Sequence, residues 1–74
     1  MIDVEEVMRL IDTIRPLLAG KPAPVQGAAL ADLLAIWLAG HRGGNRAETS
    51  RLRADLLKAH IATVRKLIHE NEGT

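Results

Sequence analysis

The chain has 74 residues, no cysteine and a formal net charge of +1. This length fits one domain, and the lack of cysteine excludes disulfide bonds and fits a cytoplasmic location. A charge so close to zero provides no long-range field that would attract nucleic acid or an anionic membrane. A single core of this size rarely contributes more than about 3–5 kcal/mol, so such chains often gain stability by oligomerisation.

Charge is distributed unevenly along the chain. Residues 1–40 carry three basic and five acidic side chains, whereas residues 41–74 carry seven and four. This asymmetry favours docking between two chains or between two halves of one chain. The acidic start, with Asp3, Glu5 and Glu6, is the wrong sign for a signal peptide.

The first predicted helix covers residues 3–18. Asp3 is a suitable N-cap, and Glu6 follows three residues later, as in a capping box. Apolar side chains then recur at alternating spacings of three and four residues, which is typical of a helix-packing seam: Val4, Val7, Ile11, Ile14 and Leu18. Pro16 predicts that this helix ends or bends near its C-terminus.

The second predicted helix covers residues 24–39, after a connector that contains Gly20 and Pro22. Between Val25 and Ala39 only Gln26 and Asp32 are polar. A helix that is apolar on every face has to be buried on every face. We therefore expect a core shared with a second copy or with another protein. A strip of small residues would allow close helix packing: Gly27, Ala28, Ala31, Ala35 and Ala39.

The same helix is a poor membrane span. It is shorter than the roughly 20 apolar residues that a bilayer requires, and it has Asp32 near its middle. We interpret Asp32 either as a paired or edge carboxylate, or as a polar lock at an interface. Trp37, the only aromatic residue, suits both a core position and an exposed interface position.

The third predicted helix covers residues 46–70 and follows the Gly43-Gly44 corner. Its predicted N-cap is Asn45, with Glu48 three residues later; Thr49 and Ser50 are alternative caps. Apolar residues form one face at four- and three-residue spacing: Leu57, Ile61, Val64 and Ile68.

Basic residues indicate an alternative role in binding an anion or nucleic acid. The candidates are two residues at the glycine corner and three that recur every seven residues on the third helix: Arg42, Arg46, Arg51, Lys58 and Arg65. The corner lacks P-loop spacing and a preceding strand, and the chain has no Phe or Tyr for base stacking. Nucleic-acid binding is therefore the weaker hypothesis.

No catalytic or metal-binding constellation is apparent. His60 and His69 are nine residues apart, whereas metal-binding pairs in a helix are three or four apart. We expect a non-enzymatic protein without a cofactor.

One block of the sequence, residues 24–41 (PVQGAALADLLAIWLAGH), resembles a segment of small uncharacterised helical proteins from bacterial and phage-associated genomes. The runs 56–60 (LLKAH) and 64–68 (VRKLI), with Asn71 and Glu72, are similar to the end of the same group. The resemblance implies a helical protein and no particular activity, ligand or site.

These patterns together predict an all-α, three-helix chain of one domain whose apolar central helix is buried in a homodimeric bundle. We expect an interface made by the first two helices: Val7, Ile11, Ile14, Leu30, Leu34, Trp37 and Leu38. The predicted function is that of a small protein–protein interaction module, a regulator or inhibitor that binds a larger partner, as an antiactivator does. A nucleic-acid-binding module and a structural or assembly subunit of a phage-like system are the alternatives.

Overall fold

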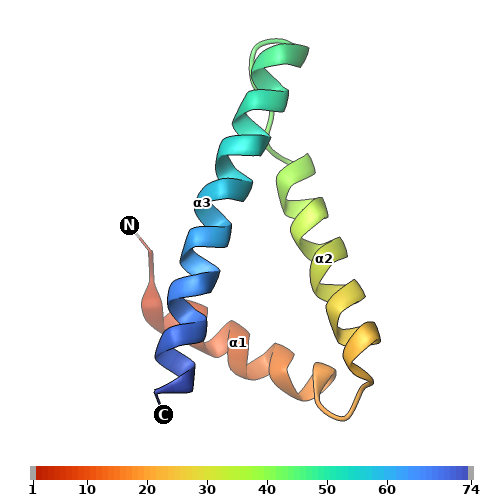
Figure 1. Ribbon diagram of the computed structural model, residues 1–74, viewed down its shortest axis with the longest axis vertical. Helices are drawn as coiled ribbons and strands as arrows, with labels where there is room; N and C mark the ends of the chain where they lie inside the picture. The colour runs from red at the N-terminus through yellow and green to blue at the C-terminus, as the bar shows by residue number, and fades with distance from the viewer. Residues whose placement is uncertain (1, 74) are drawn as a thin grey trace. The chain divides into compact units, whose positions relative to one another are not determined.

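The computed structural model describes residues 2–73, and all regular secondary structure in that range is helical (Figure 1). The three helices are α1 (Val4–Leu18), α2 (Ala23–Ala39) and α3 (Arg46–Glu72). The prediction of an all-α chain with three helices is therefore confirmed. The chain divides into two compact units, a first unit up to Ala31 and a second unit from Asp32 onward, with the boundary inside α2.

In the first unit, α1 begins and ends with specific backbone caps. The Asp3 carboxylate accepts a hydrogen bond from the Glu6 N–H at 3.1 Å, which confirms the predicted N-cap. The helix does not end at Pro16; it continues for two residues, and the Ala19 N–H donates to the Arg15 carbonyl at 3.0 Å. Gly20 then adopts a φ of 79°, a conformation that only glycine adopts at little cost.

The turn from α1 to α2 is closed by one side chain. The Gln26 side-chain amide donates to the Leu18 carbonyl at 2.7 Å. The half-buried residues of this unit, Ile14, Leu18 and Gln26, all lie near this turn. The N-terminal part of α1, including Val7 and Ile11, stays exposed.

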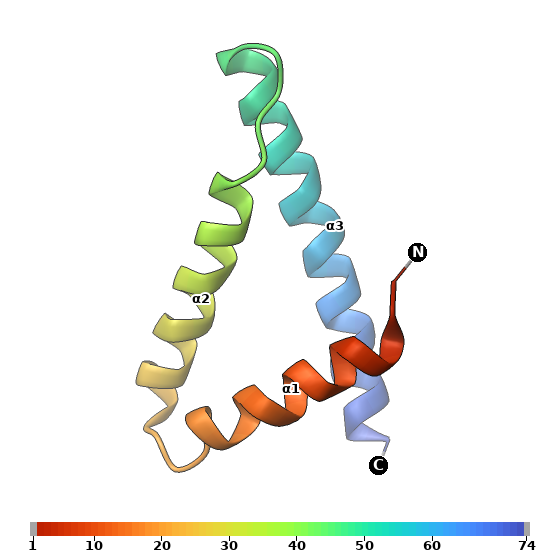
Figure 2. The same cartoon turned by 180° about the vertical axis from the view of Figure 1, so that it is seen from behind.

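In the second unit, the C-terminal end of α2 lies beside the first half of α3 (Figures 1 and 2). Leu34 and Leu38 are the half-buried residues of this part of α2. The half-buried residues of α3 form one face of the helix, which we call the inner stripe: Thr49, Leu52, Arg53, Leu56 and His60.

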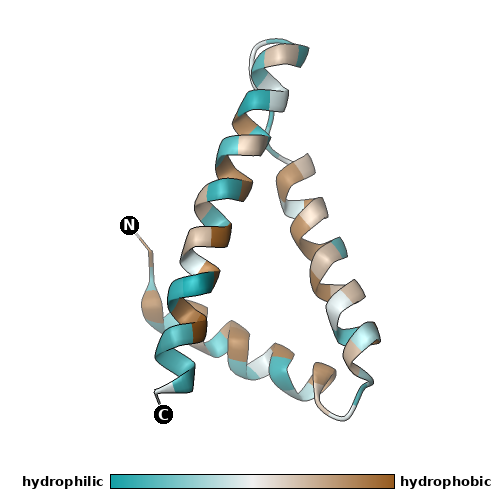
Figure 3. Ribbon diagram, viewed as in Figure 1, coloured by the Kyte–Doolittle hydropathy of each residue, from teal (hydrophilic) through white to brown (hydrophobic). Residues whose placement is uncertain are grey.

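The apolar central helix is not buried by the chain itself. None of the described residues is buried. Ile36 is 62% exposed and Leu33 is 55% exposed, and a helix turn of about 100° per residue places Ile36 opposite Leu38. Figure 3 shows the apolar character of α2 along its length. A neighbour on one side, such as α3, cannot cover such a helix, so the predicted burial of the central helix is not observed.

Candidate interaction surface

The junction between α2 and α3 is held by the Arg53 guanidinium. Its Nε donates to the carbonyls of Leu38 at 3.1 Å and of His41 at 3.0 Å, and its Nη2 donates to the Ala39 carbonyl at 2.9 Å. The guanidinium therefore caps the C-terminus of α2, where carbonyl groups lack helical partners and the helix dipole favours positive charge.

The remaining terminal carbonyls of α2 are also bonded. The Gly40 N–H reaches the carbonyls of Ile36 and Trp37, both at 3.2 Å. The His41 Nδ1 lies 2.8 Å from the Trp37 carbonyl. Because a carbonyl oxygen only accepts, Nδ1 carries the hydrogen in this contact. This end of α2 is thus satisfied by the second unit itself, and it has no need of an external partner.

The sequence left open whether Trp37 is a core residue or an exposed interface residue, and in the structure it is partly packed and partly exposed. Its ring contacts the His41 ring edge-on, with centroids 4.8 Å apart, and the His60 ring at 5.4 Å. The side chain is nevertheless 44% exposed. Trp37 therefore packs against two imidazoles and keeps the rest of its surface exposed.

The glycine corner is closed by residues of α3. Asn45 is the N-cap, and its side-chain oxygen accepts from the Glu48 N–H at 2.9 Å, so the alternative caps Thr49 and Ser50 are wrong. The Glu48 carboxylate accepts from the Gly44 N–H at 2.8 Å, one residue before the position expected in a capping box.

The Gly43 N–H donates to the Thr49 hydroxyl at 2.9 Å, so both corner glycines already use their amides within the chain. A bound anion would therefore have to rely on the two flanking side chains, Arg42 and Arg46.

The predicted interface residues fall into both units. Val7, Ile11 and Ile14 lie on α1 and Leu30 lies on α2 in the first unit, whereas Leu34, Trp37 and Leu38 belong to the second unit. Leu30 is exposed, while Leu34 and Leu38 are half-buried on the side of α2 that faces α3. Leu34 and Leu38 therefore already contribute to packing within the second unit.

The five predicted basic contacts are all exposed. Three of them, Arg51, Lys58 and Arg65, lie along one side of α3, because residues seven apart differ by only about 20° around a helix. Arg53 is different, since its guanidinium is used in the junction. Arg53 is not among the basic contacts predicted from the sequence; its position on the same face as Leu56 and His60 is the signal that could have identified its role.

A second apolar face of α3 lies about 100° around the helix from the inner stripe. We call it the outer stripe, and it consists of Ala54, Leu57, Ile61, Val64 and Ile68. All five residues are exposed within the second unit, including Ile61 at 43%. The α2–α3 contact therefore uses only part of the apolar surface of α3.

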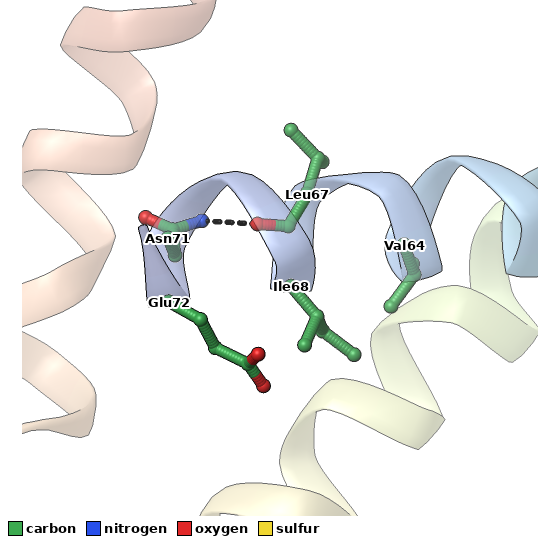
Figure 4. A pocket seen from close by; sticks show the side chains of 5 residues that line it. All are labelled: Val64, Leu67, Ile68, Asn71 and Glu72. Atoms are coloured by element: carbon green, nitrogen blue, oxygen red, sulfur yellow. Dashed lines mark hydrogen bonds between the residues drawn. The ribbon is translucent and has the colours of Figure 1, made fainter. Parts of the chain in front are cut away.

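Two shallow hollows lie along the outer stripe. The first is lined by both apolar and basic side chains: Ala54, Leu57, Lys58, Ile61, Ala62 and Arg65. The second continues toward the end of α3 and is lined by Val64, Leu67, Ile68, Asn71 and Glu72 (Figure 4). The Asn71 side-chain amide donates to the Leu67 carbonyl at 2.8 Å beside it.

Comparisons with known protein families, with curated proteins and with solved structures found no match. Among residues 2–73, no helix has the length and apolar character needed to cross a membrane. The same residues contain no cluster of three or more histidine or acidic side chains suited to a metal ion.

Proposed function

We propose that this protein is a small, non-enzymatic protein–protein interaction module that works as a homodimer and regulates or inhibits a larger protein by binding it, as an antiactivator does. The single observation that carries the proposal is the exposure of apolar side chains on every helix. Seventeen large apolar residues in the described range are exposed, and none is buried. Where such residues adjoin one another at helical spacing, as Leu57, Ile61, Val64 and Ile68 do on α3, exposed apolar surface is typical of sites that bind other proteins.

Self-association is assigned to α1 together with the exposed side of α2. On α1, Val7 and Ile11 are exposed, whereas Ile14 and Leu18, farther along the same apolar face, are half-buried near the turn to α2. Ile36 and Leu33 point away from α3, so a second copy can cover them without disturbing the α2–α3 junction. A symmetric dimer would then present each remaining surface twice, which suits a larger partner that is itself dimeric.

The first test is the solution mass by light scattering over a wide range of protein concentration, at low and high salt. We expect a dimer that persists on dilution in the wild type, and a monomer for Ile11→Asp and for Ile36→Asp. The matched control is Ala59→Asp, which places the same charge on an exposed position of α3 outside both stripes. A concentration-dependent ladder of larger species would instead support a structural or assembly subunit.

The second test is capture from an extract of the native cells with the wild type and the same variants as bait. We expect one larger protein to be captured by the wild type and by Ala59→Asp at the same yield. A monomeric wild type that captures no protein would overturn the proposal. Binding to a DNA duplex that is lost on neutralising Arg51, Lys58 and Arg65 would favour the nucleic-acid alternative.

A further inference from the structure

The outer stripe of α3 combines an apolar floor with a charged edge. Leu57 and Ile61 form the floor of the first hollow, and Lys58 and Arg65 line the same hollow. Lys58 and Arg65 are seven residues apart, so both lie on the same edge of the stripe. The opposite edge adjoins the inner stripe, which already faces α2.

We propose that the outer stripe is the docking site for an amphipathic helix of the larger partner, one with acidic side chains along one edge of its apolar face. This inference rests on the proposed function, because it names the kind of partner that such a module would bind. The two cations on the edge select carboxylates, and the apolar floor selects leucine-like side chains.

The spacing of the stripe favours a helix as the occupant. From Ala54 to Ile68 the stripe runs for about 21 Å, and its residues follow at spacings of three and four. Ridges and grooves with this spacing accept the corresponding ridges of another helix. Four turns of a partner helix would fill this length.

The same geometry disfavours nucleic acid as the occupant. A phosphate backbone would neutralise Lys58 and Arg65 but would leave Leu57 and Ile61 in contact with water. Glu72, seven residues beyond Arg65, ends the basic edge, so this edge does not extend past Arg65 as a long phosphate-binding track would. A helix with two carboxylates on one edge matches both the floor and the cations.

The test uses two designed helical peptides of about four turns as probes. Both carry leucine and isoleucine at spacings of three and four; one has two glutamates seven residues apart on one edge, and the other has two lysines there. Titration of each labelled peptide with the full chain is followed by fluorescence anisotropy at low salt. We expect the glutamate peptide to bind about tenfold or more tightly than the lysine peptide.

Two variants of the chain separate the charge from the floor. The double variant Lys58→Glu, Arg65→Glu is expected to reverse the preference, so that the lysine peptide binds more tightly. An unfolded variant would bind neither peptide, so a reversal cannot arise from misfolding. Ile61→Asp is expected to abolish binding of both peptides, and Ala59→Asp is expected to leave both affinities within about twofold of the wild type.

Equal affinities for the two peptides, no binding of either, or a charge-reversed variant that keeps the original preference would overturn the inference. If Ile61→Asp converts a dimer to a monomer in light scattering, a second copy occupies the outer stripe, and the inference is also overturned. In that case the homodimer of the proposed function remains. A monomeric wild type that captures no partner, yet prefers the glutamate peptide, would overturn the proposed function alone.

Discussion

The two turns of this chain show two different ways to connect helices. The α2–α3 junction uses side-chain hydrogen bonds from or to Arg53, His41, Glu48 and Thr49. The α1–α2 turn has one side-chain hydrogen bond, from Gln26, and the left-handed Gly20. The first connection is therefore specified in much more detail than the second.

The difference shows which contacts fix the local structure of this chain. Polar contacts define the junction of the second unit, while the apolar side chains beside it remain half-buried or exposed. A small chain with few long-range apolar contacts can fix its local connections by capping and still leave its apolar faces available. Substitutions in the junction should therefore affect stability most, and substitutions in the turn should affect it less.

The largest expected effect is at Arg53. Arg53→Met keeps the aliphatic stem but removes the donors to Leu38, Ala39 and His41. We expect the free energy of unfolding to fall by about 2 kcal/mol, because hydrogen bonds from charged donors contribute about 1.5–3 kcal/mol. The measurement is urea unfolding at one fixed protein concentration.

The control for this substitution is Arg51→Met, a nearby arginine that is exposed. We expect it to change the free energy of unfolding by no more than about 0.5 kcal/mol. Equal effects of the two substitutions would mean that the guanidinium of Arg53 does not hold the junction.

The next largest effect is expected at Gly43. A Cβ on Gly43 would lie 2.8 Å from the Glu48 Cβ and 2.9 Å from the Glu48 carbonyl carbon, so the backbone of α3 would have to shift. We expect Gly43→Ala to cost about 1.5 kcal/mol, in the lower part of the range for overpacking. At Gly44 the close atom is the Glu48 Oε2 at 2.7 Å, the end of a flexible side chain.

Gly44→Ala should therefore cost only the hydrogen bond to the Glu48 carboxylate, about 1 kcal/mol, because this bond is exposed to water whereas those of Arg53 to Leu38 and His41 are partly buried. Thermal unfolding of both variants under the same conditions gives the comparison. A larger loss for Gly44→Ala than for Gly43→Ala would contradict the packing of this corner.

The sequence was sufficient to predict those features that depend on local spacing. Both N-caps, Asp3 and Asn45, are confirmed by hydrogen bonds to the residue three positions later. These bonds lie within one helical turn, so residue type and spacing are sufficient to predict them. The three helices follow from the same local rules.

The features that the sequence did not predict depend on contacts across the loop. Arg53 reaches back to carbonyls 12 to 15 residues earlier in the chain, a distance set by the length of the corner and not by helical periodicity. The half-exposed packing of Trp37 against His41 and His60 likewise needs the corner geometry. The apolar pattern of α2 indicated a need for burial, but it could not indicate how little of that burial the chain provides.

A smaller effect is expected in the turn of the first unit. Gln26→Leu removes the donor to the Leu18 carbonyl and keeps a side chain of similar size. We expect a loss of about 1 kcal/mol in the free energy of unfolding, from one neutral hydrogen bond. Val25→Leu at a neighbouring exposed position is the control and should be close to neutral. A loss as large as that of Arg53→Met would remove the contrast between the two connections.

The smallest expected effect, of opposite sign, is at Gly27. Gly27 lies inside α2, and a Cβ there would meet no atom within 4 Å. Gly27→Ala should therefore stabilise the protein by about 0.5–1 kcal/mol, because alanine loses less conformational freedom than glycine in a helix. The full gain at every protein concentration would mean that no second copy covers the side of α2 that carries Gly27. A gain at low concentration that becomes a loss at high concentration would mean that a second copy approaches Gly27 closely, and it would place part of the interface of the proposed dimer on the small-residue strip.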